Sequence, residues 1–198
     1  MVISEAILFA HGAKTELYQT DEFIFQEGAK PKFYFQIKSG SVKLNNFLED
    51  GKEFVHGFPF EGHCIGESYL FTDHCYAVNA VATSPCEIIK LEKNLFSELL
   101  SKNTAIHFEI NRYTADRLHF RYLISTLLSI GDPITKLEIL LNHLKTYFGF
   151  TIPYSFEVPY TRHQLATLTG LRVETVIRAF NKMEKQKIIK KQNKKIYY

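Results

Sequence analysis

Four polar residues near the C-terminus are spaced so that one side of a helix would carry them. Arg172, Glu174, Thr175 and Arg178 surround Val176, which would point to the opposite side of that helix. A carboxylate accepts a hydrogen bond from N4 of cytosine, and a guanidinium donates two hydrogen bonds to O6 and N7 of guanine. The chemistry available to this set is therefore the reading of base edges, provided that a helix presents it.

The residues before this set contain the signals for such a presentation. Thr161 and Gln164 have the spacing of a capping box, which predicts that a helix begins at Arg162. Ala166 is small enough for a close helix crossing, and Gly170 can adopt the left-handed conformation that ends a helix and turns the chain. The stretch predicts a helix-turn-helix.

The second helix of the pair should run from about residue 173 to 185. Residues 187–198 favour a hairpin with Gln192-Asn193 at its tip, so the whole is a winged helix-turn-helix. The apolar residues expected to lock the two helices together are Leu165, Leu171, Val176 and Ala179. A helical hairpin that makes no DNA contact is the alternative, but the seven lysines against one glutamate in residues 182–198 favour a DNA-binding role.

Charge is unevenly divided along the chain. Residues 1–130 hold 12 Lys and Arg against 16 Asp and Glu, whereas residues 131–198 hold 12 against 5. This distribution is expected when only the C-terminal part meets a polyanion, although a solvated lysine-rich surface would look the same by charge alone.

Length and composition set the number of domains and the compartment. With 198 residues, 45% of them hydrophobic, the chain can bury one substantial core and a second small one. No apolar run approaches the roughly 18 residues of a membrane span, and no secretory signal is recognisable, so we expect a cytoplasmic protein. Its three cysteines, Cys64, Cys75 and Cys86, form no C-x-x-C pair and indicate neither disulfides nor a zinc site.

The N-terminal half has the pattern of a small β-roll. Glycines punctuate residues 21–91, and short aromatic and β-branched runs lie between them, as in a sandwich or barrel-like roll. Residues 49–52, with the sequence EDGK, predict a hairpin turn. The strand-length runs are residues 33–37, 41–47, 76–82 and 86–91.

A long helix should follow the roll. The pattern changes from Lys93 onward: residues 95–103 predict a short helix, and beyond it apolar residues recur at alternating four- and three-residue steps, as in a coiled-coil seam. The seam predicts a homodimer, although the same stripe would serve a helix packed on its own roll. Its members are Ile106, Ile110, Tyr113, Arg117, Phe120, Ile124 and Leu127, where Arg117 departs from the pattern and could set register or reach a ligand.

These elements divide the chain into three parts. We expect a β-roll sensor domain over residues 1–100, a dimerisation helix and hinge over 101–130, and a winged helix-turn-helix domain over 131–198. The hinge falls at Gly131 and Asp132-Pro133, because glycine ends a helix and an Asp-Pro pair can begin the next one. The fold class is α+β.

The chain resembles the CRP/FNR family of bacterial transcription regulators over essentially its whole length. The resemblance rests on the β-roll, the long helix and the stretch "TRHQLATLTGLRVETVIR" at residues 161–178. The family's E-T-[VI]-x-R core stands at residues 174–178, and its preceding L-[AG]-x-x-x-G pattern at residues 165–170. Val173 before Glu174 is similar to the FNR-like subfamily and implies an FNR-like half-site, whereas Ile177 replaces a serine common there. The resemblance also implies double-stranded DNA and RNA polymerase as partners, and no enzymatic activity.

Site residues follow from the resemblance and from the exposed basic side chains. The resemblance implies that Glu174 and Arg178 contact bases and that Arg162 contacts a phosphate. The full set expected at DNA is Arg162, His163, Arg172, Val173, Glu174, Thr175, Arg178, Lys182, Lys194 and Lys195.

The roll keeps only half of the family's cyclic-nucleotide loop. Gly66 and Glu67 match the pair that holds the ribose, but Tyr76 and Ala77 stand where the phosphate-binding arginine and its neighbour should be. A buried phosphodiester without a guanidinium would lose a charge-assisted pair, so cyclic nucleotide binding is disfavoured. A cyclic-nucleotide-responsive regulator that uses Gly66 and Glu67 is the alternative.

Other effectors and functions have less support in the sequence. No cysteine precedes Cys64, which argues against the iron–sulfur cluster of FNR, while haem ligation by one of the eight histidines stays open. A nucleotide-binding signalling module without DNA function is one rival. A cupin-like metalloenzyme is another, since His56, His63, Glu67 and His74 could gather around a metal, but these residues lack the H-x-H pair of such sites.

Overall fold

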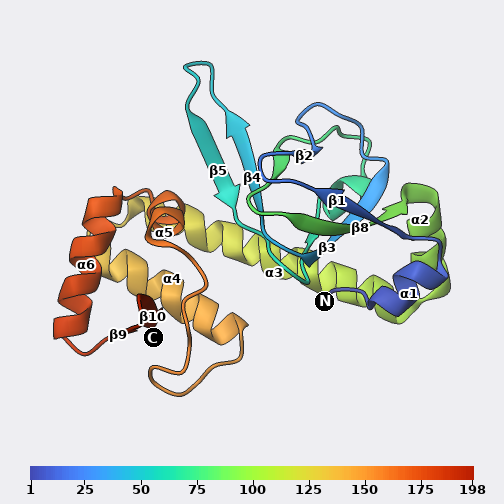
Figure 1. Ribbon diagram of the computed structural model, residues 1–198. Coiled ribbons are helices and arrows are strands. Elements are labelled where there is room, and N and C mark those ends of the chain that lie inside the picture. The colour runs from blue at the N-terminus through green and yellow to red at the C-terminus, as the bar shows by residue number, and fades with distance from the viewer. The chain divides into compact units, whose positions relative to one another are not determined.

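A computed structural model describes all 198 residues, which form two compact units, Met1–Arg117 and Leu118–Tyr198. The boundary between the units falls within the long helix α3 (Thr104–Ser129). Figure 1 labels most of the elements of both units, and its colours follow the chain from the N-terminus to the C-terminus. None of the helices combines the length and the apolar character that crossing a membrane requires.

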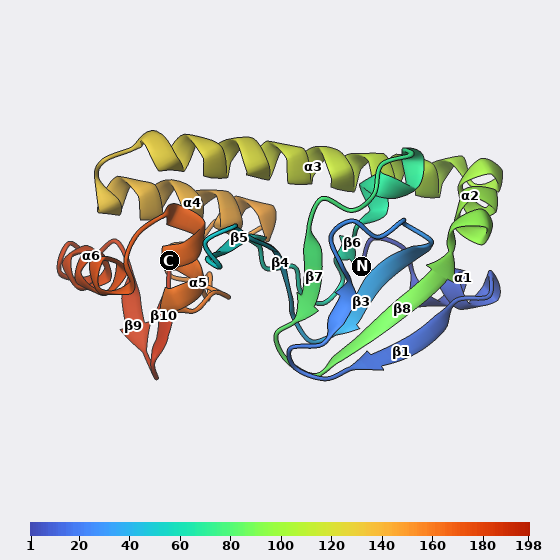
Figure 2. The same cartoon turned by 90° about the horizontal axis from the view of Figure 1, so that it is seen from above.

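The first unit is the predicted roll, built from two antiparallel four-stranded sheets. One sheet has the order β1-β8-β3-β6 and the other the order β2-β7-β4-β5; β1, β8 and β3 are seen side by side in Figure 2. The strands of the first sheet are β1 (Lys14–Tyr18), β3 (Phe33–Ser39), β6 (Cys64–Ile65) and β8 (Cys86–Glu92). Those of the second are β2 (Phe23–Phe25), β4 (Val42–Phe47), β5 (Glu53–Gly57) and β7 (Asn79–Ala82).

Alternation along β3 explains why this unit has two apolar clusters. Phe35 and Ile37 point into the cluster between the sheets, whereas Tyr34 belongs to the cluster beneath the helices. That second cluster collects side chains from α1 (Glu5–Ala10), α2 (Lys93–Lys102) and the first half of α3. The predicted strands at 33–37, 41–47 and 86–91 are confirmed, while the run at 76–82 is extended only from residue 79.

The predicted dimer seam requires a correction, because much of it faces the protein's own cores. Ile106, Ile110 and Tyr113 are buried in the cluster beneath the helices, and Leu127 is buried in the second unit. These four side chains therefore have no surface to offer a second chain. A stripe with alternating four- and three-residue steps fits a helix packed on its own domain as well as a coiled coil, so the spacing alone could not identify the partner.

The remaining seam residues also turn inward. Phe120 and Ile124 are half-buried, and the ring of Phe120 stacks on His143 of α4 with centroids 5.2 Å apart. Arg117 forms an ion pair with the carboxylate of Glu67 in the roll. Three exposed apolar side chains of α3 lie on its other face, where Phe108 is 69%, Leu118 49% and Tyr122 65% exposed; Leu128, 57% exposed, lies instead on the seam side, four residues after Ile124.

The second unit consists of the end of α3, three further helices and a two-stranded wing. The helices are α4 (Pro133–Tyr147), α5 (Arg162–Thr169) and α6 (Val173–Lys185), and the wing strands are β9 (Lys190–Gln192) and β10 (Lys195–Tyr197). Asp132 caps α4 by accepting a hydrogen bond from the Thr135 amide at 2.8 Å, with proline in the first turn, as the sequence indicates. The extended segment before α5 bridges to β10, since Val158 N–H donates to the Ile196 carbonyl.

Candidate nucleic-acid interface and the Glu67 site of the roll

The first helix of the pair, α5, begins at the predicted capping box. Gln164 N–H donates to the Thr161 hydroxyl at 3.2 Å, and Thr161 N–H donates to the Gln164 side-chain oxygen at 2.9 Å. Gly170 follows the helix with a φ of 66°, a left-handed conformation that a residue with a Cβ adopts only with strain. The chain therefore turns at the position that the sequence indicates.

The second helix, α6, has a clear division between a buried and an exposed side. Val176, Ala179, Phe180 and Met183 are buried and hold the helix on the core of the unit. On the opposite side Glu174 and Arg178 are exposed, Arg172 is exposed at the N-cap of the helix, and Val173 and Thr175 are half-buried. The structure thus brings together the residues predicted to read bases and directs their charged groups to solvent.

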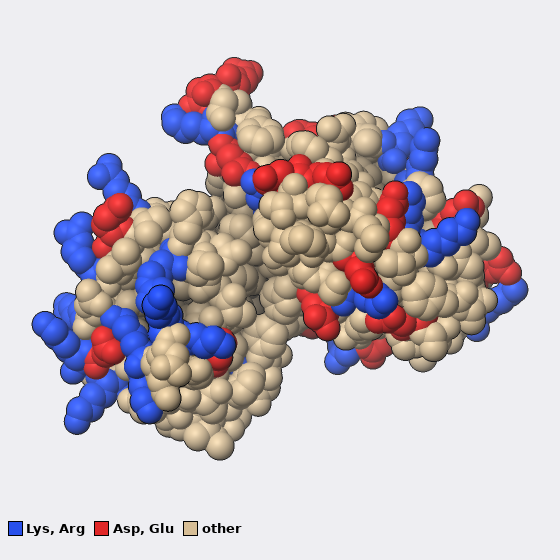
Figure 3. All heavy atoms as spheres, viewed as in Figure 1, with Lys and Arg blue, Asp and Glu red and all other residues tan.

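Basic side chains surround this exposed side. Figure 3 shows Lys and Arg gathered around α6 and the wing, with only scattered acidic groups among them. His163 and Lys182 are exposed as predicted, and Arg162 is half-buried at the start of α5. A positive surface around a helix-turn-helix attracts the phosphates of a duplex regardless of its sequence.

The two wing lysines predicted to contact phosphates, Lys194 and Lys195, have different surroundings. Its tip consists of Asn193 and Lys194, both with left-handed φ angles (49° and 64°), so the turn lies one residue later than the predicted Gln192-Asn193. Lys194 is exposed at this tip. Lys195 forms an ion pair with Glu157 at 2.7 Å, so a phosphate would have to compete with that carboxylate for its ammonium group.

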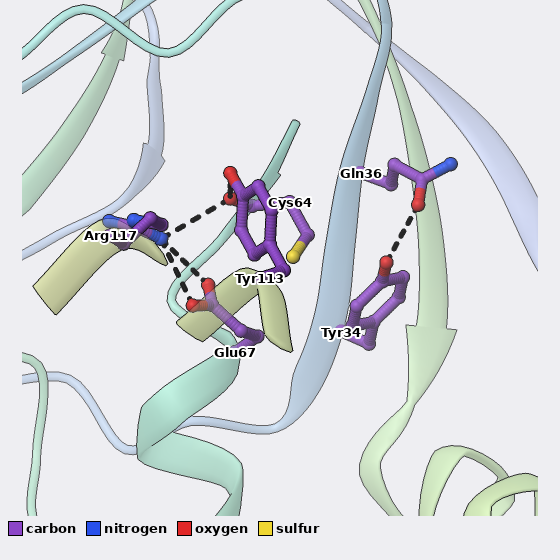
Figure 4. Close-up of polar contacts among 6 residues, drawn as sticks. All are labelled: Tyr34, Gln36, Cys64, Glu67, Tyr113 and Arg117. Carbon is purple, nitrogen blue, oxygen red and sulfur yellow. Dashed lines mark hydrogen bonds and ion pairs between the residues drawn. The ribbon is translucent and has the colours of Figure 1, made fainter. Parts of the chain in front are cut away.

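In the roll, the carboxylate of Glu67 is shielded from solvent and forms an ion pair with an arginine of α3. The side chain of Glu67 is 1% exposed, and Arg117 Nη1 donates to its two oxygens at 2.8 and 3.1 Å. The same Nη1 and the Tyr113 hydroxyl both donate to the Cys64 carbonyl, at 3.3 and 3.0 Å, and Figure 4 shows these contacts converging. Burial disfavours the charge of Arg117, but Glu67 outweighs that effect and raises the pKa of Arg117 above its ordinary value.

Tyr76 fills the space beside Gly66. Its ring stacks on Phe25 with centroids 3.9 Å apart, and it is only 3% exposed. A Cβ placed on Gly66 would lie 2.8 Å from Tyr76 and 3.0 Å from Phe25, so the two rings cover the backbone that the resemblance assigns to the ligand. The Tyr76 hydroxyl is buried without a hydrogen-bond partner, and burial raises its pKa above the ordinary value. Ala77 is exposed, and its N–H donates to the Tyr69 hydroxyl.

The residues of the metalloenzyme alternative are not gathered. His56 bonds to Asn46, His63 packs against Phe60 and Tyr113, and Glu67 is paired as described. No three His, Cys, Asp or Glu side chains of the structure are placed so that they could hold a metal ion together.

Comparison with known proteins agrees with this geometry. Residues 15–103 match the family Cyclic nucleotide-binding domain, and residues 124–197 match the family Crp-like helix-turn-helix domain. The chain belongs to the CRP/FNR family. It is similar to the cAMP-activated global transcriptional regulator CRP of Pasteurella multocida, with 27% identity over 90% of this chain and 87% of that protein. It is also similar to the regulatory protein HlyX of Actinobacillus pleuropneumoniae, with 26% identity over 90% of this chain and 75% of that protein.

Solved structures share the fold of this CRP/FNR family member. FixK2 from Bradyrhizobium japonicum has a TM-score of 0.74 at 19% identity, covering 93% of this chain and 91% of that one. CooA from Carboxydothermus hydrogenoformans has a TM-score of 0.77 at 17% identity, covering 98% and 87%. The protein is thus a transcription regulator of the CRP/FNR type, with a helix-turn-helix DNA-binding domain following a cyclic-nucleotide-binding-like roll.

Two residues acquire partners that the sequence analysis did not identify. Arg117 was noticed only as a departure from the seam, and its partner Glu67 lies far away in the chain. Lys136 was not noticed at all, although it falls on the apolar stripe of α4 one and two turns before Leu140 and Leu144. A lysine on an apolar stripe was the signal in the sequence that could have identified Lys136 as a buried residue with a polar partner.

Proposed function

We propose that the protein binds, as a homodimer, a palindromic DNA site whose half-sites lie about one helical turn apart. The observation that carries the proposal is the arrangement of α6, which buries one face in the core and exposes Glu174 and Arg178 on the other, with Arg172 exposed at its N-cap. A helix presented in this way fits the major groove, where carboxylate and guanidinium groups distinguish bases. Two copies related by a two-fold axis would read two inverted half-sites.

Within each half-site the side chains have different roles. Glu174 accepts from cytosine and Arg178 donates two hydrogen bonds to guanine, while Arg162 and the wing residue Lys194 contact phosphates. Val173, which precedes Glu174, favours the FNR-like half-site. RNA polymerase is the partner at promoters that family membership suggests.

The surface that joins two copies is the exposed face of α3. Phe108, Leu118 and Tyr122 expose large apolar areas there, and the small side chain of Ala115 lies between them in sequence. Steps of seven, three and four residues along this set keep it on one side of a helix. Covering these side chains with a second α3 would remove them from water, which favours association.

The roll acts without a cyclic nucleotide. Tyr76 and Phe25 occupy the space beside Gly66, no arginine stands at the phosphate position, and Glu67 is already paired with Arg117. A ligand would have to displace a stacked ring pair and leave a phosphate charge without a partner. Calorimetry with millimolar cyclic AMP and cyclic GMP should show no saturable heat, and a dissociation constant in the low micromolar range would instead favour a nucleotide-responsive regulator.

Selection of bound fragments from genomic DNA tests the DNA-binding proposal. Purified protein is incubated with fragmented genomic DNA, and the retained pool is sequenced and footprinted. We expect an inverted repeat and, in sedimentation, two chains per site. A retained pool without a shared half-site, or a single chain per site, would refute the proposal.

A further inference from the structure

A lysine lies within the core of the second unit. Lys136 on α4 is only 6% exposed, among the buried leucines Leu137, Leu140 and Leu144 of the same helix. Its ammonium Nζ donates to the backbone carbonyl of Thr169 at 3.0 Å. An ammonium group is costly to bury unless hydrogen bonds replace those it made with water, so this contact is the one that keeps Lys136 in place.

Thr169 is the last residue of α5, where backbone carbonyls need partners from outside the helix. The neighbouring carbonyls already have them: Leu171 N–H donates to Ala166, Gly170 N–H to Thr167, and the Thr169 hydroxyl to Leu165. The Thr169 carbonyl receives Lys136. A cation at this end also interacts favourably with the helix dipole.

The same point in the chain sets the direction of the recognition helix. α6 begins at Val173, only three residues beyond Gly170, so a movement at the end of α5 is transmitted to the start of α6. On its other side the turn packs against α3, since a Cβ on Gly170 would lie 3.1 Å from a methyl of Leu128. Lys136 therefore contacts the chain at a point where a small displacement of the turn would change the orientation of α6.

We propose that Lys136 is a positioning residue for DNA reading: it holds the C-terminus of α5 and thereby the angle at which Glu174 and Arg178 meet the bases. The inference rests on the proposed function, because it concerns the same recognition helix. Because Lys136 is buried, the proposal gives it no contact with phosphates, which separates its role from that of the exposed lysines.

The test compares Lys136→Met with Lys145→Met in the full-length protein. Both variants remove one positive charge from α4, but Lys145 lies over the ring of Tyr198 and not at the turn. Affinities are measured for a selected site and for a random duplex of equal length, at several salt concentrations, under conditions where circular dichroism shows each variant to be folded. We expect Lys136→Met to bind the selected site at least about tenfold more weakly, equivalent to about 1.4 kcal/mol, with random binding and salt slope unchanged.

Two further readouts separate positioning from general stability. Amide exchange at Gly170 and Leu171 should accelerate in Lys136→Met and not in Lys145→Met, because only the former frees the turn. Lys136→Arg should restore discrimination, since a guanidinium retains both charge and donors. If Lys136→Met does not fold, Lys136→Gln replaces it, and a specific-to-random ratio equal to that of Lys136→Arg would overturn the inference.

Two other outcomes would also contradict the inference, and a third would contradict the proposed function alone. Equal losses on both duplexes, with a salt slope lower by about one, would make Lys136 a phosphate contact. An unchanged ratio in folded Lys136→Met would remove its positioning role. If the wild-type protein itself failed to discriminate between the duplexes, the proposed function would fail and not the assignment of Lys136 within it.

Discussion

Removing Arg117 should destabilise the first unit by leaving a buried carboxylate without its cation. Glu67 is 1% exposed, and the only charge-bearing partner described for it is Arg117, at 2.8 Å. Breaking a buried ion pair from one side typically costs about 3–5 kcal/mol. The Arg117 side chain is 26% exposed, so the pair is only partly desolvated. We therefore expect Arg117→Met to lower the free energy of unfolding by about 3 kcal/mol, the lower end of that range.

The size of this loss makes it measurable. For a unit of this length, about 3 kcal/mol corresponds to a decrease in melting temperature of roughly 10–15 °C. The chain has no tryptophan but 11 tyrosines, so near-ultraviolet circular dichroism of the tyrosines can follow the transition. Leu95→Met, at a half-buried apolar position of the same unit without an ion pair, serves as control and should change stability by less than about 1.5 kcal/mol.

A second replacement distinguishes the ion pair from packing. In Glu67→Leu with Arg117→Met both charges are absent, and the Cys64 carbonyl still accepts from the Tyr113 hydroxyl. Replacing both members of a buried pair by apolar residues is often close to neutral, so the double variant should recover most of the loss. If Arg117→Met is as stable as the wild type, or the double variant is as unstable as the single one, the reasoning is refuted.

Three further outcomes are expected. Phe108→Asp combined with Tyr122→Asp should give a monomer in sedimentation at micromolar concentration, because charges would replace the exposed apolar face; a persistent dimer would place the interface elsewhere. Lys194→Gly should stabilise the second unit by up to about 1 kcal/mol, since glycine adopts the left-handed φ without strain, yet weaken binding to all DNA sequences; tighter binding would contradict the phosphate contact. Burial, aided by Arg117 and the N-terminal amine, lowers the pKa of His63 to about 4, so the unfolded state binds its proton first. The stability of the first unit should therefore decrease by about 2–3 kcal/mol as pH falls from about 6.5 to 4, and His63→Gln should flatten that decrease.

Local signals in the sequence were sufficient to predict the two helices of the helix-turn-helix. The capping box at Thr161 and Gln164, the glycine at 170 and the apolar spacing of α6 act over a few residues, and the structure has each of them in place. Strands β3, β4 and β8 were predictable for the same reason, because alternation and turn residues are local.

Long-range pairing could not be derived in this way. The stripe on α3 has the spacing of a dimer seam, but Ile110 packs on the protein's own roll, and only the exposure of Phe108 on the other face indicates where a second chain could bind. Arg117 and Glu67 meet because β6, η1 (Glu67–Phe71) and α3 converge, which no spacing in the sequence reveals. Strands β1, β2, β5 and β6 were not predicted; β2 and β6 carry too few residues for a period to appear, and β1 and β5 have only five residues each.

The binding of Arg178→Ala to matched duplexes tests most directly whether α6 reads the DNA sequence. The selected site, the same site with one guanine of each half-site replaced, and a random duplex are compared at one salt concentration. We predict that Arg178→Ala loses about 1–3 kcal/mol on the selected site, no longer distinguishes it from the replaced site, and binds the random duplex nearly as the wild type does. Equal weakening on all three duplexes would mean that Arg178 holds only the phosphate backbone, and the account of α6 as a base reader would be wrong.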